Sequence, residues 1–102
     1  MEEVSTKVVY IDPILRELIP GFLQNRWREI DEMKYLIENS QYKQIEIYGH
    51  SMKGYGAGYG FTDISHIGKC LEEAASNENR DEIVRLLHKL STYLDEADIR
   101  YK

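Results

Sequence analysis

His50 is the side chain of this sequence best suited to chemistry by its type and its surroundings. It lies in the stretch EIYGHSMKGYGAGYGFTDIS, Glu46 to Ser65, and Lys53 and Gly54 follow it by three and four residues. A neutral imidazole is nucleophilic near pH 7, so an exposed histidine here would present a usable nucleophile. Glycine is a poor helix former, and its repeated use directly after this histidine requires an explanation.

A helical wheel places His50 on the solvent side of a helix that is expected over about residues 41–60. At about 100° per residue, His50, Gly54 and Ala57 fall on one side, with Lys53 on the flank. The opposite stripe must face the core, and it comprises Ile45, Tyr48, Gly49, Met52, Tyr55, Gly56 and Tyr59. His50 is therefore expected to be exposed at the middle of a helix.

The glycines of this helix have different expected roles. Each interior glycine costs about 1 kcal/mol relative to alanine, a large amount for a domain stable by about 5–15 kcal/mol. Gly49 and Gly56 face the core and let another helix approach closely. Gly54 faces solvent, where it leaves a bare strip beside His50 that the backbone of another protein can approach. Gly60 is expected to end the helix in the left-handed conformation.

Glu72 is the second candidate for a functional side chain. It lies at the edge of the apolar stripe of the next helix, near Ser65 and Lys69. If the two helices pack antiparallel, its carboxylate can reach an imidazole nitrogen. A carboxylate bonded to Nδ1–H would fix the tautomer and leave Nε2 as the nucleophile. The wheel alone favours the plainer alternative, a solvated carboxylate beside Lys69.

The elements that must position these residues are amphipathic helices with short connections. Asp12 and Pro13 have the types expected at the N-cap and first position of a short helix, and Pro20 predicts a break or kink at Ile19. Trp27 is expected on the apolar face of the helix that follows. Further helix caps are expected from Asn39 and Ser40, from Thr62 or Asp63, and from Asn79 with Glu82 in a capping box.

The helical periodicity predicts an all-α fold, an antiparallel four-helix bundle with a short additional N-terminal helix, in which residues 1–102 form a single domain. The run TKVVYI near the start has β character but no obvious partner, so it is interpreted as an extended lead-in. The terminal DEADIRYK is interpreted as a fraying helix end. Arg26 lies near the apolar face of the long helix and either snorkels outward or pairs with a carboxylate. The expected helices cover about residues 12–18, 20–38 and 41–60, and are followed by a fourth that begins near Thr62 or Asp63 and a last one that begins near Asn79 and frays over residues 95–102.

The composition excludes several classes of function. The net charge is −5 and no basic stripe is present, which argues against nucleic acid or an anionic membrane as a partner. No apolar run approaches the length of a membrane span, and the acidic start has no apolar signal core. Cys70 is the only cysteine, so an intramolecular disulfide is impossible. The expected location is cytoplasmic.

Two other chemistries fit the sequence poorly. A phosphate-cradling loop would need G-x-x-x-x-G-K-[ST] after a strand, and neither is present here. A metal or haem site would need convergent ligands, whereas His50, His66 and His88 fall on different helices and all appear on polar faces. No metal and no cofactor is expected for this chain.

The stretch GHSMKGYGAGYGFTDISHIGKCLEEAA resembles the core motif of histidine-containing phosphotransfer (HPt) domains, the carriers of two-component phosphorelays. The motif is a histidine, an apolar residue, Lys-Gly, small residues, and a glycine ten positions after the histidine with an apolar residue behind it. The segment IGKCLEEAA resembles the following helix of that family, and the match covers about a quarter of the chain. The matching residues are His50, Met52, Lys53, Gly54, Ala57, Gly60 and Phe61.

The resemblance implies a carrier rather than an enzyme with its own turnover. His50 would accept a phosphoryl group from a phospho-aspartyl receiver domain, or from a kinase, and pass it to another receiver. Lys53 would offset phosphoryl charge, and Gly54 would leave room for the partner. In the chemotaxis branch of the family a glutamate that bonds the histidine occupies the position of Glu72. The bulky Tyr55 and Tyr59 depart from the family's small residues.

The resemblance also indicates the partners. They are response-regulator receiver domains, with a hybrid histidine kinase as a further candidate, and the receiver would supply Mg²⁺. The chain is expected to be a monomer. Two alternatives remain open: a non-phosphorylated helical-bundle adaptor that binds a signalling partner, and a detached first domain of a larger kinase. The face expected to dock the receiver comprises Gly54, Ala57, Gly58 and Phe61.

Overall fold

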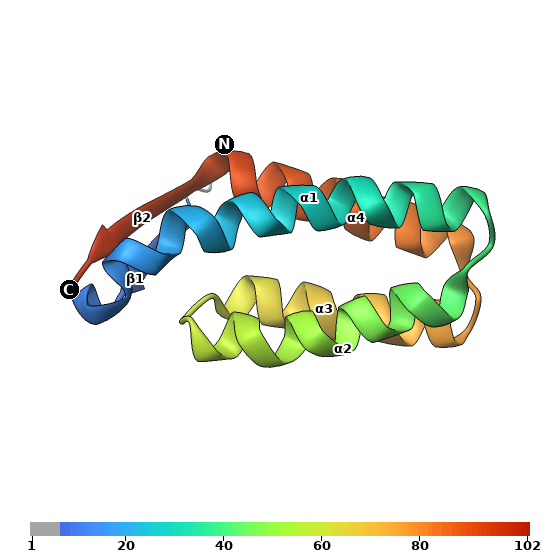
Figure 1. The fold of residues 1–102 in the computed structure, drawn as a ribbon, viewed down its shortest axis with the longest axis horizontal. Helices are drawn as coiled ribbons and strands as arrows, with labels where there is room; N and C mark the ends of the chain where they lie inside the picture. Colours follow the sequence, from blue (N-terminus) through green and yellow to red (C-terminus); the bar gives the residue numbers. More distant parts are fainter. Residues whose placement is uncertain (1–6) are drawn as a thin grey trace, which may run out of the picture.

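Four α-helices in two layers make up most of the chain in a computed structural model, which describes residues 7–102 (Figure 1). α1 and α4 form one layer, and α2 and α3 form the other. The prediction of a mostly helical fold is confirmed. The acidic start and Thr6 of the predicted lead-in lie outside the described residues. The elements are β1 (Lys7–Ile11), the 3₁₀ helix η1 (Pro13–Leu18), α1 (Ile19–Glu38), α2 (Tyr42–Gly58), α3 (Thr62–Ser76), α4 (Arg80–Glu96) and β2 (Ala97–Tyr101).

The N-terminal helical turn runs directly into the first long helix. Asp12 caps η1 as predicted, because its carboxylate accepts a hydrogen bond of 3.0 Å from the Ile14 N–H. The non-helical geometry predicted at Ile19 is wrong, since Ile19 has helical angles of φ −65° and ψ −45°, although the 3₁₀ helix does give way to α1 at this residue. Pro20 lies in the first turn of α1, where a backbone N–H has no partner to lose.

The remaining helix ends follow the predictions in part. Gly60 has φ +91°, and its N–H donates to Ala57 while the Phe61 N–H donates to Gly56, which is the expected left-handed termination of α2. Asn79 caps α4 by accepting from the Glu82 N–H at 3.2 Å. The Glu82 carboxylate instead pairs with Arg85, so the reciprocal half of the capping box is not formed.

Two of the predicted caps are wrong. The residue at the N-cap of α2 is Gln41, and that at the N-cap of α3 is Phe61; neither makes a side-chain cap hydrogen bond. Asn39 instead closes the end of α1, where its side-chain amide donates to the Tyr35 carbonyl at 2.9 Å. Asp63 lies in the first turn of α3, where the interaction of a negative charge with the helix dipole is stabilising.

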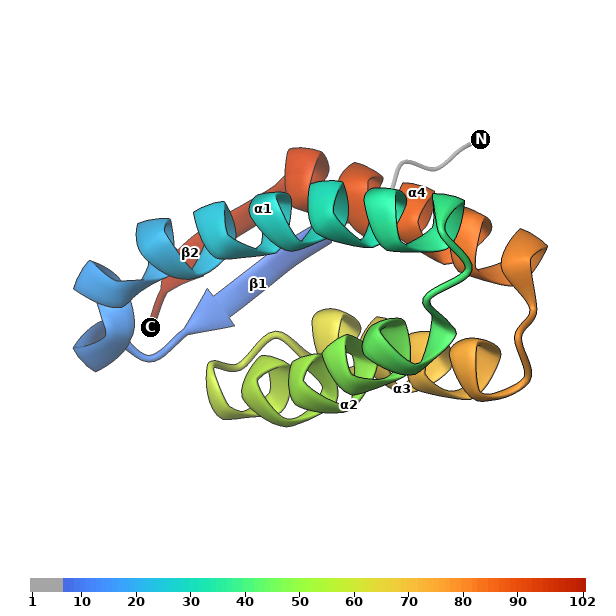
Figure 2. The same ribbon diagram turned by 45° about the vertical axis from the view of Figure 1, so that its right-hand side comes forward.

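A short parallel strand pair corrects the prediction for both ends of the chain. β1 pairs with β2 in the register Lys7↔Ala97 to Ile11↔Tyr101, and Figure 2 shows the two strands side by side near α1. The lead-in therefore has a partner, and the segment interpreted as fraying helix is a strand. Ile11 is buried while Val8 and Tyr10 are exposed, the period of two expected for a strand packed on one face.

The core lies between the two helical layers, and it includes Ile45 and Met52 of the stripe predicted to face it. Trp27, predicted on the apolar face of α1, is instead partly exposed. Tyr48, Tyr55 and Tyr59 are half-buried at the edge of the core rather than inside it. No helix within residues 7–102 is long and apolar enough to cross a bilayer. The fully buried side chains include Ile30, Met33, Ile45, Met52, Ile64, Ile67, Leu71, Ile83, Leu86 and Leu90.

Candidate functional site

His50 stands on the outward face of α2, near the middle of that helix. Its side chain is 69% exposed, while Ile45 and Met52 on the opposite face of α2 are fully buried. The predicted exposure of the imidazole is therefore confirmed. The ring is accessible to a second protein without any rearrangement of the helix.

The Glu72 carboxylate of α3 fixes the orientation of this imidazole. Its Oε2 lies 2.9 Å from His50 Nδ1. An ionised carboxylate can only accept a hydrogen bond, so Nδ1 carries the proton and Nε2 keeps its lone pair. Among the described residues, Nε2 has no hydrogen-bond partner. The ring is thus held in the tautomer that leaves the outer nitrogen nucleophilic.

Lys53 binds the other oxygen of the same carboxylate. Its Nζ lies 3.2 Å from Glu72 Oε1, one helical turn beyond His50. The hydrogen bonds from His50 and then Lys53 lower the pKa of Glu72 below its ordinary value, so the carboxylate is ionised near neutral pH. The alternative of a solvated Glu72 beside Lys69 is wrong, because the carboxylate pairs with these two residues of α2.

Two glycines on the inner face of α2 bring α3 close enough for this contact. A Cβ at Gly49 would lie 2.5 Å from the Glu72 backbone nitrogen, and one at Gly56 would lie 2.7 Å from that of Ser65. Both predictions of a close approach are confirmed. Sequence reasoning missed two features of this crossing. Ser65 Oγ donates a hydrogen bond of 2.7 Å to the Lys53 carbonyl. Gly68 on α3 also permits the close approach, because a Cβ there would lie 2.6 Å from the Lys53 backbone nitrogen.

The surface beside His50 is bare, as predicted. Gly54, Ala57 and Gly58 are exposed, and a Cβ at Gly54 or Gly58 would meet no atom within 4 Å. Ile47, one turn before His50, is also exposed and apolar, and the sequence analysis did not single it out. The glycine strip therefore offers open space and not a packing contact.

Phe61 is not part of this surface, which corrects the predicted docking face. Its side chain is fully buried, and its ring stacks on Phe22 with centroids 5.2 Å apart and planes at 10°. The left-handed turn at Gly60 sends the chain back toward the core, so the next side chain points inward. Phe61 closes the core at the α2–α3 turn.

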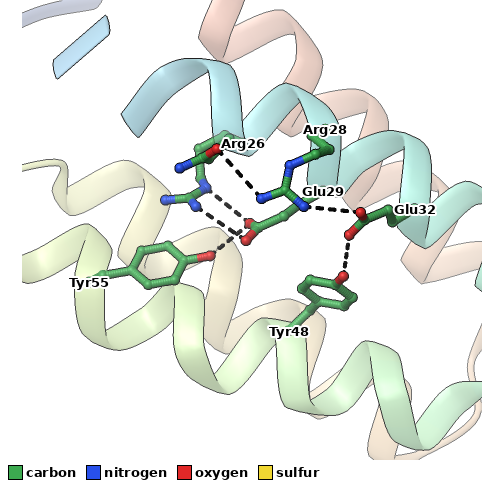
Figure 3. A network of polar contacts seen from close by, with 7 residues as sticks. Arg26, Arg28, Glu29, Glu32, Tyr48 and Tyr55 are labelled. Atoms are coloured by element: carbon green, nitrogen blue, oxygen red, sulfur yellow. Dashed lines mark hydrogen bonds and ion pairs between the residues drawn. The ribbon is translucent and has the colours of Figure 1, made fainter. Parts of the chain in front are cut away.

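On its other side, α2 is held to α1 by two tyrosine–glutamate hydrogen bonds (Figure 3). Tyr55 donates to Glu29 at 2.7 Å, and Tyr48 donates to Glu32. The bond to Glu32 is the main cause that raises the pKa of Tyr48 to about 12, whereas burial is the main cause that raises the pKa of Tyr55. Both bonds orient the helix that carries the imidazole.

Arg26 is buried and paired, which resolves the two alternatives left open for it. Its Nη2 donates to Glu29 at 3.2 Å, and its Nε lies 2.9 Å from the other carboxylate oxygen without hydrogen-bond alignment. The guanidinium lies 4.5 Å from the Phe22 ring centroid and 4.0 Å from that of Tyr55. Arg26 therefore pairs within its own helix and stacks against α2.

The other histidines lie apart from this site. His66 on α3 and His88 on α4 are exposed, and Cys70 Sγ lies 3.7 Å from His66 Nε2. Within residues 7–102, no group of three or more histidine, cysteine, aspartate or glutamate side chains is arranged to hold a metal ion.

No family model, curated protein or solved structure matches this chain. The indications of a function are therefore the motif around His50 and the geometry of His50, Lys53 and Glu72.

Proposed function

We propose that this chain is a histidine phosphotransfer domain. His50 accepts a phosphoryl group from a phospho-aspartyl receiver domain, or from a kinase, and passes it to another receiver. The four helices form the antiparallel bundle of that family, with η1 as the additional N-terminal helix. The observation that carries the proposal is an exposed imidazole whose Nδ1 is bonded to Glu72 and whose Nε2 is open to solvent.

The chemistry requires little of the carrier. The Nε2 lone pair of His50 attacks phosphorus, the bond from phosphorus to the aspartyl oxygen breaks, and its electron pair returns to the aspartate as a carboxylate. The proton on Nδ1 stays in place, so the ring becomes cationic as the bond forms. The adjacent carboxylate of Glu72 stabilises that positive charge, as a triad carboxylate does for its imidazolium.

Lys53 supplies the positive charge for the incoming phosphoryl group. Its Nζ is held 3.2 Å from Glu72, on the same helix as His50 and one turn away. A long flexible side chain can turn from the carboxylate to a phosphoryl oxygen without moving the backbone. The receiver contributes its own Mg²⁺, so this chain needs no cofactor and has no turnover of its own.

The strip of Gly54, Ala57 and Gly58 is the surface on which the receiver docks. A receiver must bring its aspartyl phosphate to about 3 Å from Nε2, and side chains on this strip would hold it away. Receivers and histidine kinases act in the cytoplasm, so a chain that exchanges phosphoryl groups with them acts there as well. The carrier acts as a monomer.

The test is phosphotransfer from labelled receivers in the presence of Mg²⁺. We expect an acid-labile, base-stable label on the wild-type chain and none on His50→Ala. His66→Ala is the matched control, since it removes another exposed histidine and should label normally. A panel of receivers that bind the chain and leave no label would favour a non-phosphorylated adaptor.

A further inference from the structure

We propose that Gly49 and Gly68 are positioning residues for His50, because they set the helix separation at which Glu72 reaches the imidazole. Both lie at the crossing of α2 and α3, and Gly49 directly precedes His50. The relevance of this crossing to phosphotransfer rests on the proposed function. The effect on the His50–Glu72 contact does not.

The contact at this crossing is between the backbones of the two helices. A Cβ at Gly49 would lie 2.5 Å from the Glu72 nitrogen, 2.7 Å from the Gly68 carbonyl oxygen and 3.0 Å from the Glu72 Cα. A Cβ at Gly68 would lie 2.6 Å from the Lys53 nitrogen and 2.8 Å from the Gly49 carbonyl oxygen. No side-chain rotation can relieve these contacts, so a methyl group at either position must push the helices apart.

The residues in contact are those that make the site. Gly49 touches the backbone of Glu72, the residue whose carboxylate bonds His50 Nδ1. Gly68 touches the backbone nitrogen of Lys53, which pairs with the same carboxylate. A change in the separation of α2 and α3 at this point is therefore transmitted directly to both contacts of Glu72.

The required displacement is large enough to break the hydrogen bond. Ordinary contacts of a Cβ begin at 3.4 Å, so a methyl group now placed at 2.5 Å requires the helices to separate by about 0.9 Å. The same displacement would stretch the 2.9 Å contact between His50 and Glu72 beyond hydrogen-bond range. Without the carboxylate, nothing selects the tautomer with the proton on Nδ1.

The experiment measures the tautomer of the neutral His50 ring by ¹⁵N–¹H correlation spectroscopy. We expect the Nδ1–H form in the wild type, and its loss in both Gly49→Ala and Gly68→Ala. Gly21→Ala is the matched control, because its Cβ on α1 would meet nothing within 4 Å. Retention of the Nδ1–H form in folded Gly49→Ala or Gly68→Ala would overturn the proposal.

If the alanine variants do not fold, a third variant tests whether the distance between α2 and α3 at this crossing is fixed. Glu72→Asp keeps both glycines and the charge but shortens the side chain by one methylene, about 1.5 Å. If the crossing holds the helices at a fixed separation, the aspartate cannot reach Nδ1 and the Nδ1–H form is lost. An aspartate that keeps this tautomer would show that the separation adapts to the side chain, which contradicts the proposal.

Phosphotransfer measured on the same variants separates this inference from the proposed function. We expect a rate that falls by roughly tenfold or more in Gly49→Ala and is unchanged in Gly21→Ala, since misplacement by about 1 Å is known to have effects of that size. If the wild type takes no label while the tautomer contrast is present, the proposed function fails and the positioning role stands.

Discussion

Glu72 Oε2 lies 2.9 Å from Nδ1 of His50, across the crossing at which α2 and α3 meet at Gly49 and Gly68. The other oxygen of that carboxylate lies 3.2 Å from Lys53 Nζ. One side chain of α3 thus binds both His50 and Lys53 of α2. Substitutions at four residues on and around this site, and at one residue of the core, test these contacts and the packing behind them.

Replacing Glu72 by glutamine should remove tautomer selection without disturbing the fold. The amide has the same shape, but its oxygen and nitrogen can accept or donate, so either imidazole tautomer is tolerated. We expect a transfer rate roughly 10- to 100-fold lower, the effect seen for carboxylates that orient metal-ligating imidazoles, measured by single-turnover phosphotransfer. Glu73→Gln, at the exposed neighbouring position, should match the wild type. A Glu72→Gln rate equal to the wild type would remove the carboxylate from the mechanism.

Replacing Lys53 by alanine should slow transfer and leave stability nearly unchanged. The side chain is 41% exposed and its ion pair with Glu72 is near the surface, so the free energy of unfolding should change by less than about 1 kcal/mol. The phosphoryl group, in contrast, would lose its nearest positive charge. Denaturant unfolding and the transfer rate are the two measurements, and Lys69→Ala on α3 is the control. An unchanged rate would show that Lys53 has no part in the transfer.

Replacing Gly54 by leucine should block receiver docking while preserving or raising the melting temperature. The new side chain would enter open space, and removal of an interior glycine favours the helix by about 1 kcal/mol. Labelling by a receiver should be lost, whereas labelling by a small phosphoramidate donor should persist, because Nε2 stays accessible. Gly21→Leu, on α1, is the control. Normal labelling of Gly54→Leu by a receiver would contradict the role of the bare strip.

Local periodicity was sufficient to predict the helices and the outward face of His50. The apolar repeats of α1 to α4 are long, and a residue opposite a buried stripe must face solvent. The same wheel could not decide whether Glu72 bonds His50, because that contact depends on how far apart two helices lie. The distance is set by Gly49 and Gly68, whose joint role appears only when the two helices are placed together.

Long-range pairing and turns account for the predictions that failed. β1 finds its partner β2 at the far end of the chain, and nothing local to either segment identifies the other. Phe61 was assigned to the docking face from the resemblance alone, and the left-handed turn at Gly60 that directs its side chain inward was not taken into account. The partner of Arg26 was within reach of sequence reasoning, since Glu29 lies one turn along the same helix.

Replacing Tyr48 by phenylalanine should weaken the fold at neutral pH and have little effect at high pH. The Tyr48 pKa is raised from 10.0 to about 12 in the folded chain, chiefly by its hydrogen bond to Glu32. The stabilisation by this bond is therefore complete below about pH 10 and is lost as the pH rises through about 12. We expect Tyr48→Phe to be less stable by about 1 kcal/mol at pH 8, and the difference to shrink in unfolding measurements from pH 10 upward. Tyr35→Phe, at an exposed tyrosine of α1, is the matched control.

Replacing Phe61 by alanine tests its assignment to the core. The ring is fully buried and stacked on Phe22, so its loss should leave a cavity and cost about 3–5 kcal/mol, measured by chemical unfolding. The rate of phosphotransfer from a receiver to the folded Phe61→Ala protein should remain close to the wild-type rate, because the ring does not reach the surface beside His50. Ile47→Ala, at an exposed apolar residue, should cost less than about 1 kcal/mol. A Phe61→Ala variant with wild-type stability and no receiver labelling would return this residue to the docking face.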